Sequence, residues 1–521
     1  MKKVACFVAV AAFCALGYVS PVAAQQREHH PHAAENKAAE AVPKETKVVT
    51  QHTIRIDGKT IPYKATVGSI LIHNGQGQPT ALIYYFAYTE DNVTNMSQRP
   101  IAFLYNGGPG SSCVWLHMGG LGPMRVEVAN AAPTGGAPYK LVPSVYTLLP
   151  ATDMVFIDPV GTGFSHAVGK AKNWDFWGVD SDVQSLARFI VDYISQNDRW
   201  NSPKYLMGES YGTFRSVALG AYLQSRDNMY LNGIVLMSSV LDLSTISFHP
   251  GSDLPYVLYL PSYAATAWYH NELHPKPANL PAFLDKVKQF AETKYANALM
   301  LGSGLSQTEK EAIAKQLSEY TGLSVNYLMR ADLRVNLPQF MAQLQRSRGL
   351  VTGRLDARFS GYTYDPLAEY ATYDPQSTSI SGAYVAAFHT YLTQDLKYNP
   401  KRPYMVSAHF DGHRWKWTRA ERNGYGFPGA ANVMPDLKQA LITNPHLYVQ
   451  VENGYFDLAT PFFQTEYTMD HLGLPPALQS HIGLKFYDVG HMIYVHVPSL
   501  EQLGANIRAF VAAHSKPQQM Q

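Results

Sequence analysis

The sequence predicts an α/β fold with a mostly parallel central sheet flanked by helices, and two observations lead to this class. The first is a series of short apolar segments with strand character, near residues 101–105, 153–157, 204–207, 231–236, 446–451 and 484–489. The second is the segment 208–223, in which a Gly-Glu-Ser-Tyr-Gly turn leads from an apolar run into a helix-compatible stretch. Strands that alternate with helices favour βα units and hence a parallel sheet.

The segment ahead of these strands has a different pattern. Residues 50–88 alternate apolar and polar side chains around two turn dipeptides, Asp57-Gly58 and Asn74-Gly75. This pattern predicts antiparallel strands joined by hairpins, which we expect at the edge of the sheet. The last helix is expected near residues 500–514.

Between about residues 244 and 400 the pattern changes to helices. Ser306 and Glu309 make a capping box at the start of one helix, and Gly322 is a stop signal at its end. A helical insertion at this point is expected to lie over the carboxyl edge of the sheet as a lid. Its aromatic side chains line a substrate pocket or pack the insertion itself, and packing is the more frequent role. They are Tyr256, Tyr259, Tyr263, Trp268 and Tyr269.

The turn at residues 208–212 has the form of a nucleophile elbow, a strained strand-to-helix turn that exposes a serine hydroxyl above a parallel sheet. Its serine is Ser210. Glycine is needed at Gly208 and Gly212, because a side chain at either position would collide with the neighbouring strand and helix. The five-residue pattern also occurs by chance, so it predicts catalysis only together with other segments.

A second segment, Asn106-Gly107-Gly108-Pro109-Gly110-Ser111-Ser112, follows the strand predicted at 101–105. A glycine-rich loop can present bare backbone N–H groups to an anion, because no Cβ blocks the approach. The loop can therefore form an oxyanion hole. An ordinary turn would also satisfy these residues.

An acid and a histidine follow the last two predicted strands. Asp457 ends the segment Gly454-Tyr455-Phe456-Asp457, and His491 lies in Gly490-His491-Met492. Each alone has a simpler interpretation, because a strand-end Asp is often a turn residue and a single His is often packed in a core. With Ser210 they reproduce the chain order Ser, Asp, His of the α/β-hydrolase fold. We therefore expect Ser210, Asp457 and His491 to form a catalytic triad.

On these motifs the chain resembles the bacterial branch of the serine carboxypeptidase family. A Glu directly before the nucleophile, combined with Asn-Gly-Gly-Pro-Gly, separates this family from lipases and esterases of the same fold. Further matching segments are residues 82–86, 156–165 and 231–236. The resemblance implies an α/β-hydrolase fold and a serine-type carboxypeptidase that hydrolyses C-terminal residues from peptides through an acyl-enzyme intermediate. No metal or organic cofactor is expected.

The predicted roles follow from the chemistry of these groups. A serine hydroxyl is a poor nucleophile at neutral pH, so His491 would take its proton during the attack. Asp457 would hold the tautomer of His491 and stabilise its imidazolium form. The tetrahedral oxyanion would accept a hydrogen bond from the backbone N–H of Tyr211, the residue after the nucleophile, and, by resemblance, from that of Gly108.

The resemblance also places Asn106 and Glu209 among the side chains that bind the terminal carboxylate of the substrate. A carboxyl group can bind a carboxylate only when it is protonated, so Glu209 predicts peptidase activity favoured by acid pH. Two positions depart from the family: Leu104 replaces its usual Trp, and Gly120 replaces the Glu that normally pairs with the one before the serine. Arg215 stands where eukaryotic members have an aromatic residue. It would either bind a carboxylate or neutralise Glu209.

These departures keep two other classes of function open. One is an esterase, acyltransferase or lyase on the same fold. The other is a non-catalytic binding protein, which the complete set of triad residues disfavours. Hydrolysis of a free-ended peptide, its amide and a simple ester separates the three.

The N-terminus predicts export. A basic start at residues 1–3, an apolar stretch at 4–19 and small residues at 22–24 have the form of a signal peptide cleaved near Ala24. The apolar stretch is short for a membrane span, so we expect a periplasmic or secreted protein without a stable membrane anchor. Cleavage removes two of the three cysteines and leaves Cys113, so the mature chain can form no internal disulfide.

Composition agrees with a globular enzyme: 46% of the 521 residues are hydrophobic and 16% are charged. The formal net charge of +2 argues against a nucleic-acid surface, and the expected partner is a peptide substrate. The sequence does not indicate an oligomeric state. We divide the chain into a signal peptide (1–24), a polar, disordered leader (25–47), a first part of the core (48–243), the helical lid insertion (244–400) and a second part of the core (401–521).

Overall fold

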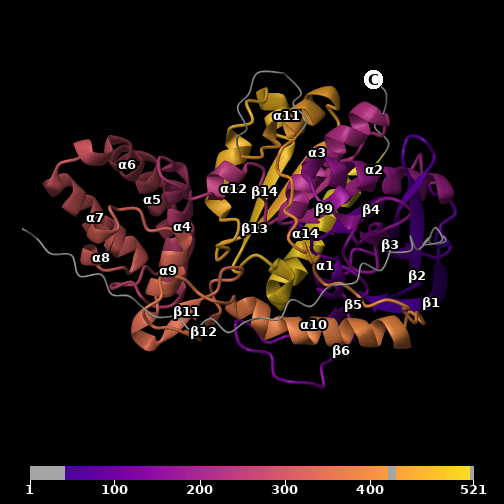
Figure 1. Cartoon of the computed structure of the whole chain (residues 1–521), viewed down its shortest axis with the longest axis horizontal. Coiled ribbons are helices and arrows are strands. Elements are labelled where there is room, and N and C mark those ends of the chain that lie inside the picture. Colours follow the sequence, from indigo (N-terminus) through magenta and orange to yellow (C-terminus); the bar gives the residue numbers. More distant parts are fainter. Residues whose placement is uncertain (1–41, 420–429, 517–521) are drawn as a thin grey trace, which may run out of the picture. The chain divides into compact units, whose positions relative to one another are not determined.

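The computed structural model describes residues 42–419 and 430–516 of the chain. The predicted signal peptide and residues 25–41 of the predicted leader lie outside this part. Within it, ten strands form one sheet (Figure 1). They are β1 (Lys47–Ile56), β2 (Lys59–His73), β3 (Pro79–Glu90), β4 (Ile101–Tyr105), β7 (Asp153–Ile157), β8 (His166–Ala167), β9 (Lys204–Glu209), β10 (Gly233–Met237), β13 (Tyr448–Gly454) and β14 (Ile482–Tyr487).

The sheet combines an antiparallel edge with a parallel core. β1, β2 and β3 are joined as antiparallel hairpins, and β3 pairs antiparallel with β7. From β7 onwards the strand order is β7-β4-β9-β10-β13-β14, and every neighbouring pair is parallel. The predicted mostly parallel sheet and its antiparallel edge are therefore confirmed. The first hairpin turns at Asp57 and Gly58, both at positive φ, as the type of turn favoured in two-residue hairpins requires.

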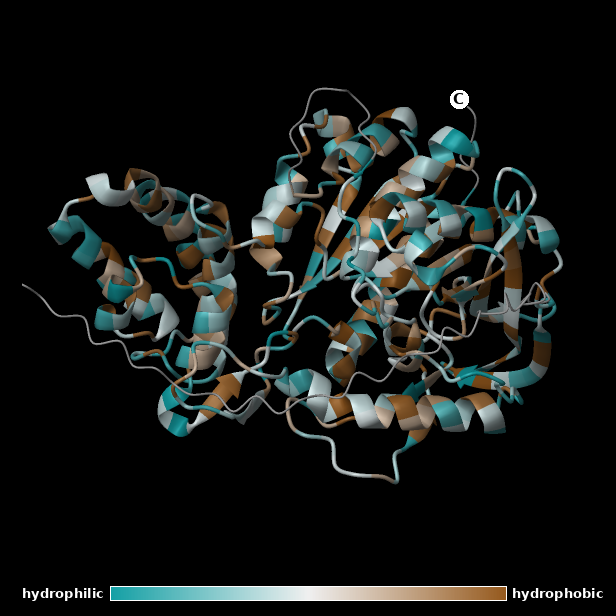
Figure 2. Ribbon diagram, viewed as in Figure 1, coloured by the Kyte–Doolittle hydropathy of each residue, from teal (hydrophilic) through white to brown (hydrophobic). Residues whose placement is uncertain are grey.

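Helices cover both faces of the sheet (Figure 1). On one face lie α2 (Val179–Gln196), α3 (Tyr211–Arg226) and α11 (Met434–Thr443), and on the other lie α1 (Val114–Met118), α10 (Pro375–Gln394) and α14 (Val497–His514). Successive strand residues point to opposite faces: Leu206 packs with the first group and Met207 with the second. Both are fully buried, which explains the continuous apolar runs of the parallel strands (Figure 2).

The helices of the insertion form a hydrophobic core of their own, which extends to α12 (Phe462–Asp470). The helices are α4 (Leu254–Tyr269), α5 (Leu280–Phe290), α6 (Ala296–Leu301), α7 (Gln307–Thr321), α8 (Val325–Arg330) and α9 (Leu337–Gln343). The predicted capping box of Ser306 and Glu309 at the start of α7 is present, and Gly322 ends this helix with φ 70°. Tyr259 and Tyr263 are buried in this core, where they pack against Phe248 and Phe340.

α10 lies within the range expected to form the insertion but packs elsewhere. Its buried residues, among them Ile380, Tyr384 and Phe388, join the core under the main sheet, next to α1. Between the insertion helices and α10 the chain also forms a short hairpin of β11 (Leu350–Thr352) and β12 (Ser360–Tyr362). Strands of three residues are too short for an alternating pattern to reveal, so the sequence did not predict them.

The remaining short elements connect these layers. They are β5 (Met124–Val126), β6 (Leu141–Pro143), α13 (Pro476–Gln479), η1 (Asn173–Phe176), η2 (Leu243–Ile246), η3 (Ala291–Tyr295), η4 (Gly302–Gly304), η5 (Arg346–Arg348) and η6 (Ile493–Val495).

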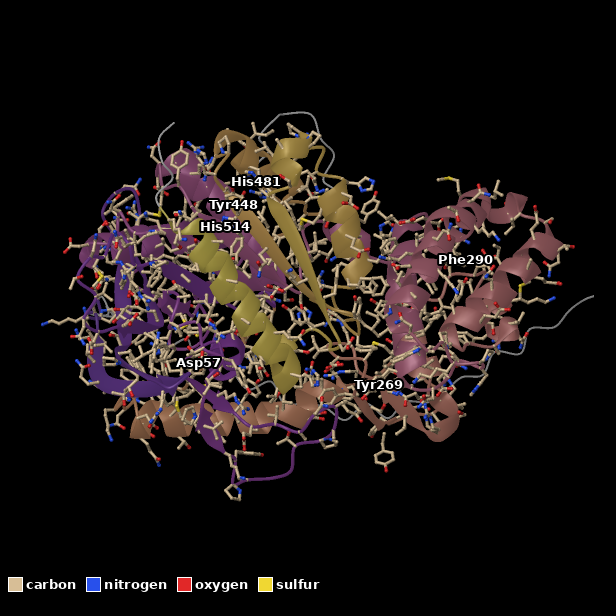
Figure 3. All side chains as sticks on the ribbon, turned by 180° about the vertical axis from the view of Figure 1, so that it is seen from behind. Asp57, Tyr269, Phe290, Tyr448, His481 and His514 are labelled. Atoms are coloured by element: carbon tan, nitrogen blue, oxygen red, sulfur yellow. The ribbon has the colours of Figure 1, made fainter. Side chains whose placement is uncertain are left out.

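An aromatic stack fixes the end of α14 to the sheet. The ring of Tyr448, at the start of β13, is stacked on His481 with the ring centroids 4.3 Å apart and on His514 with the centroids 3.7 Å apart (Figure 3). The last turn of the chain's final helix is thereby held beside the parallel strands. In the described ranges we find no helix with the length and apolar character that crossing a membrane requires.

Candidate active site

Ser210 occupies the turn between β9 and α3, with φ 61° and ψ −130°. A positive φ is rare for a residue other than glycine, and this strain is typical of a nucleophile elbow. The Ser210 N–H donates to the carbonyl oxygen of Met237 at 2.9 Å, and the Ser210 carbonyl accepts from Thr213 N at 2.8 Å. The strained turn is thus anchored to both β10 and α3.

The two glycines of the elbow have no room for a side chain. A Cβ on Gly208 would overlap the carbonyl group of Gly212, and a Cβ on Gly212 would lie 3.0 Å from the carbonyl oxygen of Tyr105 in β4. The neighbouring helix and strand therefore approach the elbow as closely as the sequence pattern predicts. This close approach sets the height of Ser210 above the sheet.

Asp457 and His491 follow the carboxyl ends of β13 and β14 and are in contact. His491 Nδ1 and Asp457 Oδ2 are 2.8 Å apart. The other oxygen, Oδ1, accepts from the backbone N–H groups of Ala459 and Thr460 at 2.8 and 2.9 Å, and the Thr460 hydroxyl donates to Oδ2 at 2.8 Å. These bonds fix the carboxylate so that Oδ2 faces the imidazole.

The backbone of His491 is held as tightly as its ring. Its N–H donates to the carbonyl oxygen of Leu355 at 2.6 Å, and its carbonyl accepts from the Ser238 hydroxyl at 2.6 Å. Burial disfavours the charged imidazolium, but Asp457 and, more weakly, Glu209 favour it, and together they raise the pKa of His491. The site therefore stabilises a proton on this ring.

Two cavities meet at Ser210. The first, of about 260 Å³, is lined by Ser210, His491, Asn106, Glu209 and Gly108 among others. It brings together residues that are far apart in the chain, although no hydrogen bond between Ser210 and His491 is found in the described structure. In uncomplexed enzymes such catalytic bonds are often long and shorten only with bound substrate.

The second cavity, of about 470 Å³, lies on the other side of Ser210. It shares Gly108 and Ser210 with the first, and its further lining is largely apolar: Tyr211, Val240, Leu243, Ile246 and Trp417. Both cavities have mixed linings and share Ser210, and the carboxyl and amide groups of Glu209 and Asn106 line only the first.

The predicted oxyanion donors both line the second cavity. Tyr211 begins α3, a helix of 16 residues, so its N–H has no partner within the helix. Gly108 has φ +104° in the glycine loop. Neither N–H donates a hydrogen bond to any of the residues that the structure describes. A helix N-terminus and a free loop N–H next to Ser210 form an environment that favours an anion.

Asn106 and Glu209 form a buried pair at the wall of the first cavity. Asn106 Oδ1 accepts from Leu116 N at 3.0 Å, which orients the amide so that Nδ2 donates to Glu209 Oε1 at 2.8 Å. Glu209 Oε2 is buried and has no hydrogen-bond partner among the residues that the structure describes. Burial raises the pKa of Glu209, although His491 and the neighbouring hydrogen bonds oppose this effect. The pair thus presents one free carboxyl oxygen.

The backbone around Gly120, where the family has a glutamate, is closely packed. Gly120 has φ +112° and is packed so that a Cβ would lie 2.8 Å from Leu500, so this backbone leaves no space for a Glu side chain. A Cβ at the preceding Gly119 would overlap the ring of Tyr494. The buried Tyr494 hydroxyl lies near Glu209 and acts to lower the pKa of Glu209, but the geometry between them is outside that of a hydrogen bond.

The structure places Leu104 and Arg215 away from the cavities. Leu104 is fully buried in the core under the sheet. Arg215 is also fully buried: its Nε donates to Asp182 Oδ2 at 2.7 Å, and NH1 donates to the backbone carbonyl of Asn106 at 2.7 Å. The guanidinium also lies 5.0 Å from the ring centre of Tyr211. Arg215 therefore contacts the backbone of the carboxylate-binding candidates and not the cavity.

Sequence reasoning missed residues that the fold brings in from other segments. Ser407 and Trp417, from the loop after α10, line the first and the second cavity respectively. Arg354, ahead of α10, lines both. The aromatic-rich run around Trp415 and Trp417 was a signal in the sequence that could have pointed to this loop. In the structure, the rings of both residues pack edge-on against Tyr211.

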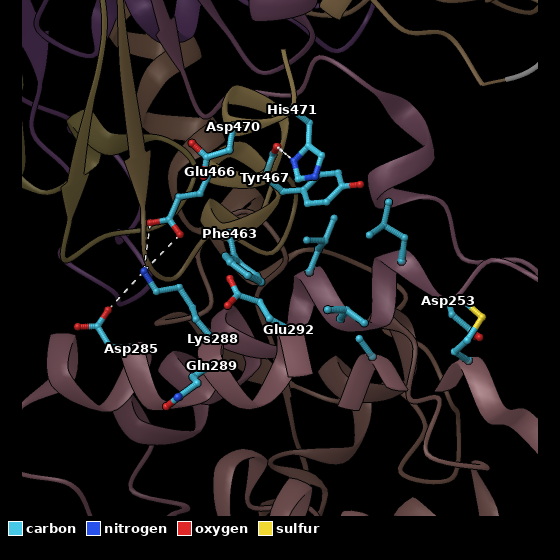
Figure 4. A pocket seen from close by; sticks show the side chains of 15 residues that line it. Asp253, Asp285, Lys288, Gln289, Glu292, Phe463, Glu466, Tyr467, Asp470 and His471 are labelled. Atoms are coloured by element: carbon cyan, nitrogen blue, oxygen red, sulfur yellow. Dashed lines mark hydrogen bonds and ion pairs between the residues drawn. The ribbon is translucent and has the colours of Figure 1, made fainter. Parts of the chain in front are cut away.

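A larger cavity of about 760 Å³ lies between α4, α5 and α12 (Figure 4). Lys288 Nζ is 3.3 Å from a carboxylate oxygen of Glu466 and 3.4 Å from Asp285 at its wall. None of the described residues that line it is a serine, threonine or cysteine. Size alone therefore does not identify the active site. No cluster of three or more His, Cys, Asp or Glu side chains with the geometry of a metal site occurs among the residues that the structure describes.

Two known proteins are similar to parts of this chain. "Serine carboxypeptidase-like 8" of Arabidopsis thaliana is 28% identical over 210 residues, which is 38% of this chain and 44% of that protein. "Retinoid-inducible serine carboxypeptidase" of Homo sapiens is 29% identical over 144 residues, 27% of this chain and 29% of that protein. The matches thus span less than half the length of these relatives.

The chain is similar in fold to the crystal structure of Kex1(delta)p, a prohormone-processing carboxypeptidase from Saccharomyces cerevisiae. The TM-score is 0.50 at 15% sequence identity, and the superposition covers 87% of this chain and 91% of that one. At this identity the likeness shows the α/β-hydrolase fold alone. A family model described as serine carboxypeptidase matches residues 71–482, which is most of the chain. The chain therefore belongs to the serine carboxypeptidase family.

Proposed function

We propose that this protein is a serine-type carboxypeptidase that removes C-terminal residues from peptides. One observation carries the proposal: Ser210 and His491 share a cavity with the buried pair of Asn106 and Glu209. A nucleophile and a base beside a free carboxyl oxygen suit a substrate that ends in a carboxylate next to the scissile bond.

In the first half of the reaction, Ser210 Oγ attacks the carbonyl carbon of the last peptide bond while His491 Nε2 takes the hydroxyl proton. The oxygen of the tetrahedral intermediate accepts hydrogen bonds from the N–H groups of Gly108 and Tyr211. Loss of one such donor typically lowers the rate about 100-fold or more. The imidazolium then donates its proton to the amine nitrogen, the C–N bond breaks, and the C-terminal amino acid leaves.

In the second half, water replaces the departed amine. His491 takes a proton from the water as its oxygen attacks the acyl-enzyme ester, and then returns the proton to Ser210 Oγ as the shortened peptide leaves. Asp457 stays ionised throughout and holds the imidazole in place through the 2.8 Å contact with Nδ1. The reaction consumes one water molecule and needs no cofactor.

Selection of a chain end is assigned to Asn106 and Glu209. Protonated Glu209 would donate from its unpartnered Oε2 to the terminal carboxylate of the substrate. The raised pKa of Glu209 extends the pH range in which this proton is present, so peptidase activity is expected to be strongest at acid pH. Arg215, through its bond to the Asn106 carbonyl, would position this pair.

One alternative, an esterase, acyltransferase or lyase, is favoured by Gly120, which stands where the family has the Glu that pairs with the one before the serine. The test is hydrolysis of three substrates across pH: a peptide with a free C-terminus, the same peptide amidated, and a simple ester. A carboxypeptidase releases the last residue of the free-ended peptide much faster than that of the amide. Equal rates on both, with efficient ester hydrolysis, would favour the alternative, and no turnover of any substrate would indicate a binding protein.

The proposed location is outside the cytoplasm. The signal-like residues 1–24 support export with cleavage near Ala24, and the buried Cys113 is the one cysteine of the chain beyond this segment. A structure without disulfides relies on the core clusters of the two sheet faces.

A further inference from the structure

Residues 353–358, ahead of α10, are wedged between the two loops that carry Asp457 and His491. Leu355 O accepts from His491 N at 2.6 Å, and Ala357 N donates to the carbonyl oxygen of Phe456 at 2.9 Å. A Cβ on Gly490 would overlap the backbone of Asp356. The segment therefore forms part of the frame of the active site.

Arg354 sits in this segment with its backbone fixed on both sides. Its N–H donates to Asp374 Oδ2 at 2.6 Å, and its carbonyl accepts from Leu458 N at 3.1 Å. Its side chain is exposed, and the residue lines both cavities at Ser210. A fixed backbone thus holds an exposed cationic side chain at the two cavities that meet at Ser210.

The guanidinium of Arg354 has no ion pair and no hydrogen bond within the described part of the chain. The nearby carboxylates already have other partners. Asp356 pairs with Arg358 at 2.6 Å, and Asp374 accepts from backbone N–H groups, including that of Ser377 at 2.8 Å. The positive charge of Arg354 also acts to lower the pKa of His491, which agrees with a position close to the catalytic ring.

The surroundings of this cation favour a small anion. The first cavity adds the side chains of Ser377, Ser381 and Ser407, which carry hydroxyl groups. Glu209 is the one carboxyl group among the described residues that line the two cavities, and its raised pKa favours the neutral form. An unpaired guanidinium can bind a carboxylate through two parallel hydrogen bonds.

We propose that Arg354 binds a carboxylate of the substrate beside the scissile bond and so makes this enzyme selective for carboxylate-bearing chain ends. The carboxylate is either that of the C-terminus or that of an acidic side chain flanking the bond. This inference rests on the proposed function, and it moves the cationic contact expected at Arg215 to a different segment of the chain.

The experiment compares three peptides that differ in one carboxylate. The first peptide has Gln next to the scissile bond and a free C-terminal carboxylate. The second is the amide of the first. The third is the same amide with one Gln that flanks the scissile bond replaced by Glu. Dissociation constants are measured by calorimetry in the full chain carrying Ser210→Ala, and kcat/KM is measured in the active enzyme. The matched control is Arg55→Gln, because Arg55 is an exposed residue of β1 outside both cavities.

Arg354→Gln is expected to weaken binding of one or both carboxylate peptides by about tenfold and to leave binding of the neutral amide unchanged. Arg354→Lys, which keeps the charge but not the planar fork, should lose less. A loss confined to the free-ended peptide identifies the terminal carboxylate as the ligand, and a loss confined to the Glu peptide identifies the side chain. Arg55→Gln should change neither.

An equal loss for all three peptides, no loss for any, or no binding of either carboxylate peptide to the parent would overturn the inference. The proposed function is judged separately. If the active enzyme cleaves no peptide while the binding pattern holds, carboxypeptidase activity is refuted and carboxylate recognition by Arg354 stands.

Discussion

Asn106 Nδ2 donates a 2.8 Å hydrogen bond to Glu209 Oε1, while the second oxygen of the same carboxyl group, Oε2, is buried without a partner in the described part of the chain. A buried polar atom without a partner costs stability, and in an active site it marks a place where a ligand completes the hydrogen bonding. Since Asn106 fills one side of the carboxyl group, only Oε2 is left for the substrate. We therefore expect the proton on Oε2 to control binding of a terminal carboxylate.

The variant Glu209→Gln tests whether the proton on Glu209 governs binding of the terminal carboxylate. The pKa of Glu209 is raised by burial, so its proton is present at low pH and is lost as the pH rises through that value. The pKa of His491 is raised as well, so its base form is lost as the pH falls. Plots of kcat/KM against pH for free-ended peptides should therefore be bell-shaped in the parent protein. In Glu209→Gln the amide donates at every pH, so the high-pH limb should flatten.

Ester hydrolysis is the internal control for this experiment, because it needs neutral His491 but no carboxylate binding. With an ester neither protein should show the high-pH limb, and the low-pH limb should move to somewhat lower pH in Glu209→Gln, because the charge of Glu209 contributes to the raised pKa of His491. A high-pH limb that persists unchanged in Glu209→Gln would show that another group controls binding of the peptide.

Tyr494→Phe should move the high-pH limb of peptide hydrolysis to higher pH. The Tyr494 hydroxyl acts to lower the pKa of Glu209, so its removal should raise that pKa and extend peptide hydrolysis to higher pH. The readout is the midpoint of the high-pH limb, which a merely structural role would not shift. Tyr263→Phe is the matched control, because Tyr263 is also buried with an unpartnered hydroxyl but lies in the core of the insertion. A midpoint that is unchanged in Tyr494→Phe would contradict this role.

The grouping of the proposed triad residues was predictable because each of them follows the end of a strand. Ser210, Asp457 and His491 each follow a strand of the parallel sheet, and parallel strands bring their carboxyl ends to one edge. Short-range signals were also sufficient for the hairpin at Asp57 and for the cap at Ser306, because both depend on residues next to each other in the chain.

Arg354 and Tyr494 could not be found in this way, because their distance to the site is set by tertiary packing. Arg215 is the converse case, a residue close to Ser210 in sequence that lies outside the cavities. It follows Ser210 by five residues, and a helix turns by about 500° over that distance, so its side chain points away from the nucleophile. Closeness in sequence made it a candidate for the cavity, whereas the helix directs it to Asp182.

Export and the thiol content give a further prediction. The exported protein is expected to begin near Gln25, and its thermal unfolding should be the same with and without a reducing agent, because Cys113 alone remains. Mass spectrometry of the exported form and thermal melts in both conditions provide the measurements. Detection of residues 1–24 on that form, or a marked fall in melting temperature of the monomer on reduction, would contradict the prediction.

Ser210→Ala and His491→Ala are each expected to remove nearly all turnover, by a factor on the order of 10⁶ as in other serine hydrolases, without unfolding the protein. Asp457→Asn should cost less, about 10⁴-fold, because it leaves the geometry in place but changes the tautomer of His491. Steady-state kinetics and circular dichroism check both points. Near-normal hydrolysis by a folded Ser210→Ala protein would remove Ser210 from the mechanism.

The elbow glycines give a prediction about stability. In Gly208→Ala the new methyl group would overlap the Gly212 carbonyl, so β9 and α3 must separate. Such overpacking costs about 1–3 kcal/mol, and occasionally more, in the free energy of unfolding. Moving α3 also displaces Ser210, so kcat should fall even where the protein still folds.

Gly75→Ala is the matched control for this change. Gly75 lies in the turn between β2 and β3, and nothing lies within 4 Å of a Cβ at that position. A Gly-to-Ala change without strain stabilises a protein by about 0.4–1 kcal/mol, because it restricts the unfolded chain. Urea titration of both variants should therefore show opposite shifts of the unfolding midpoint. If Gly208→Ala were as stable and as active as the parent, the close approach of α3 to β9 would not be what holds the nucleophile in place.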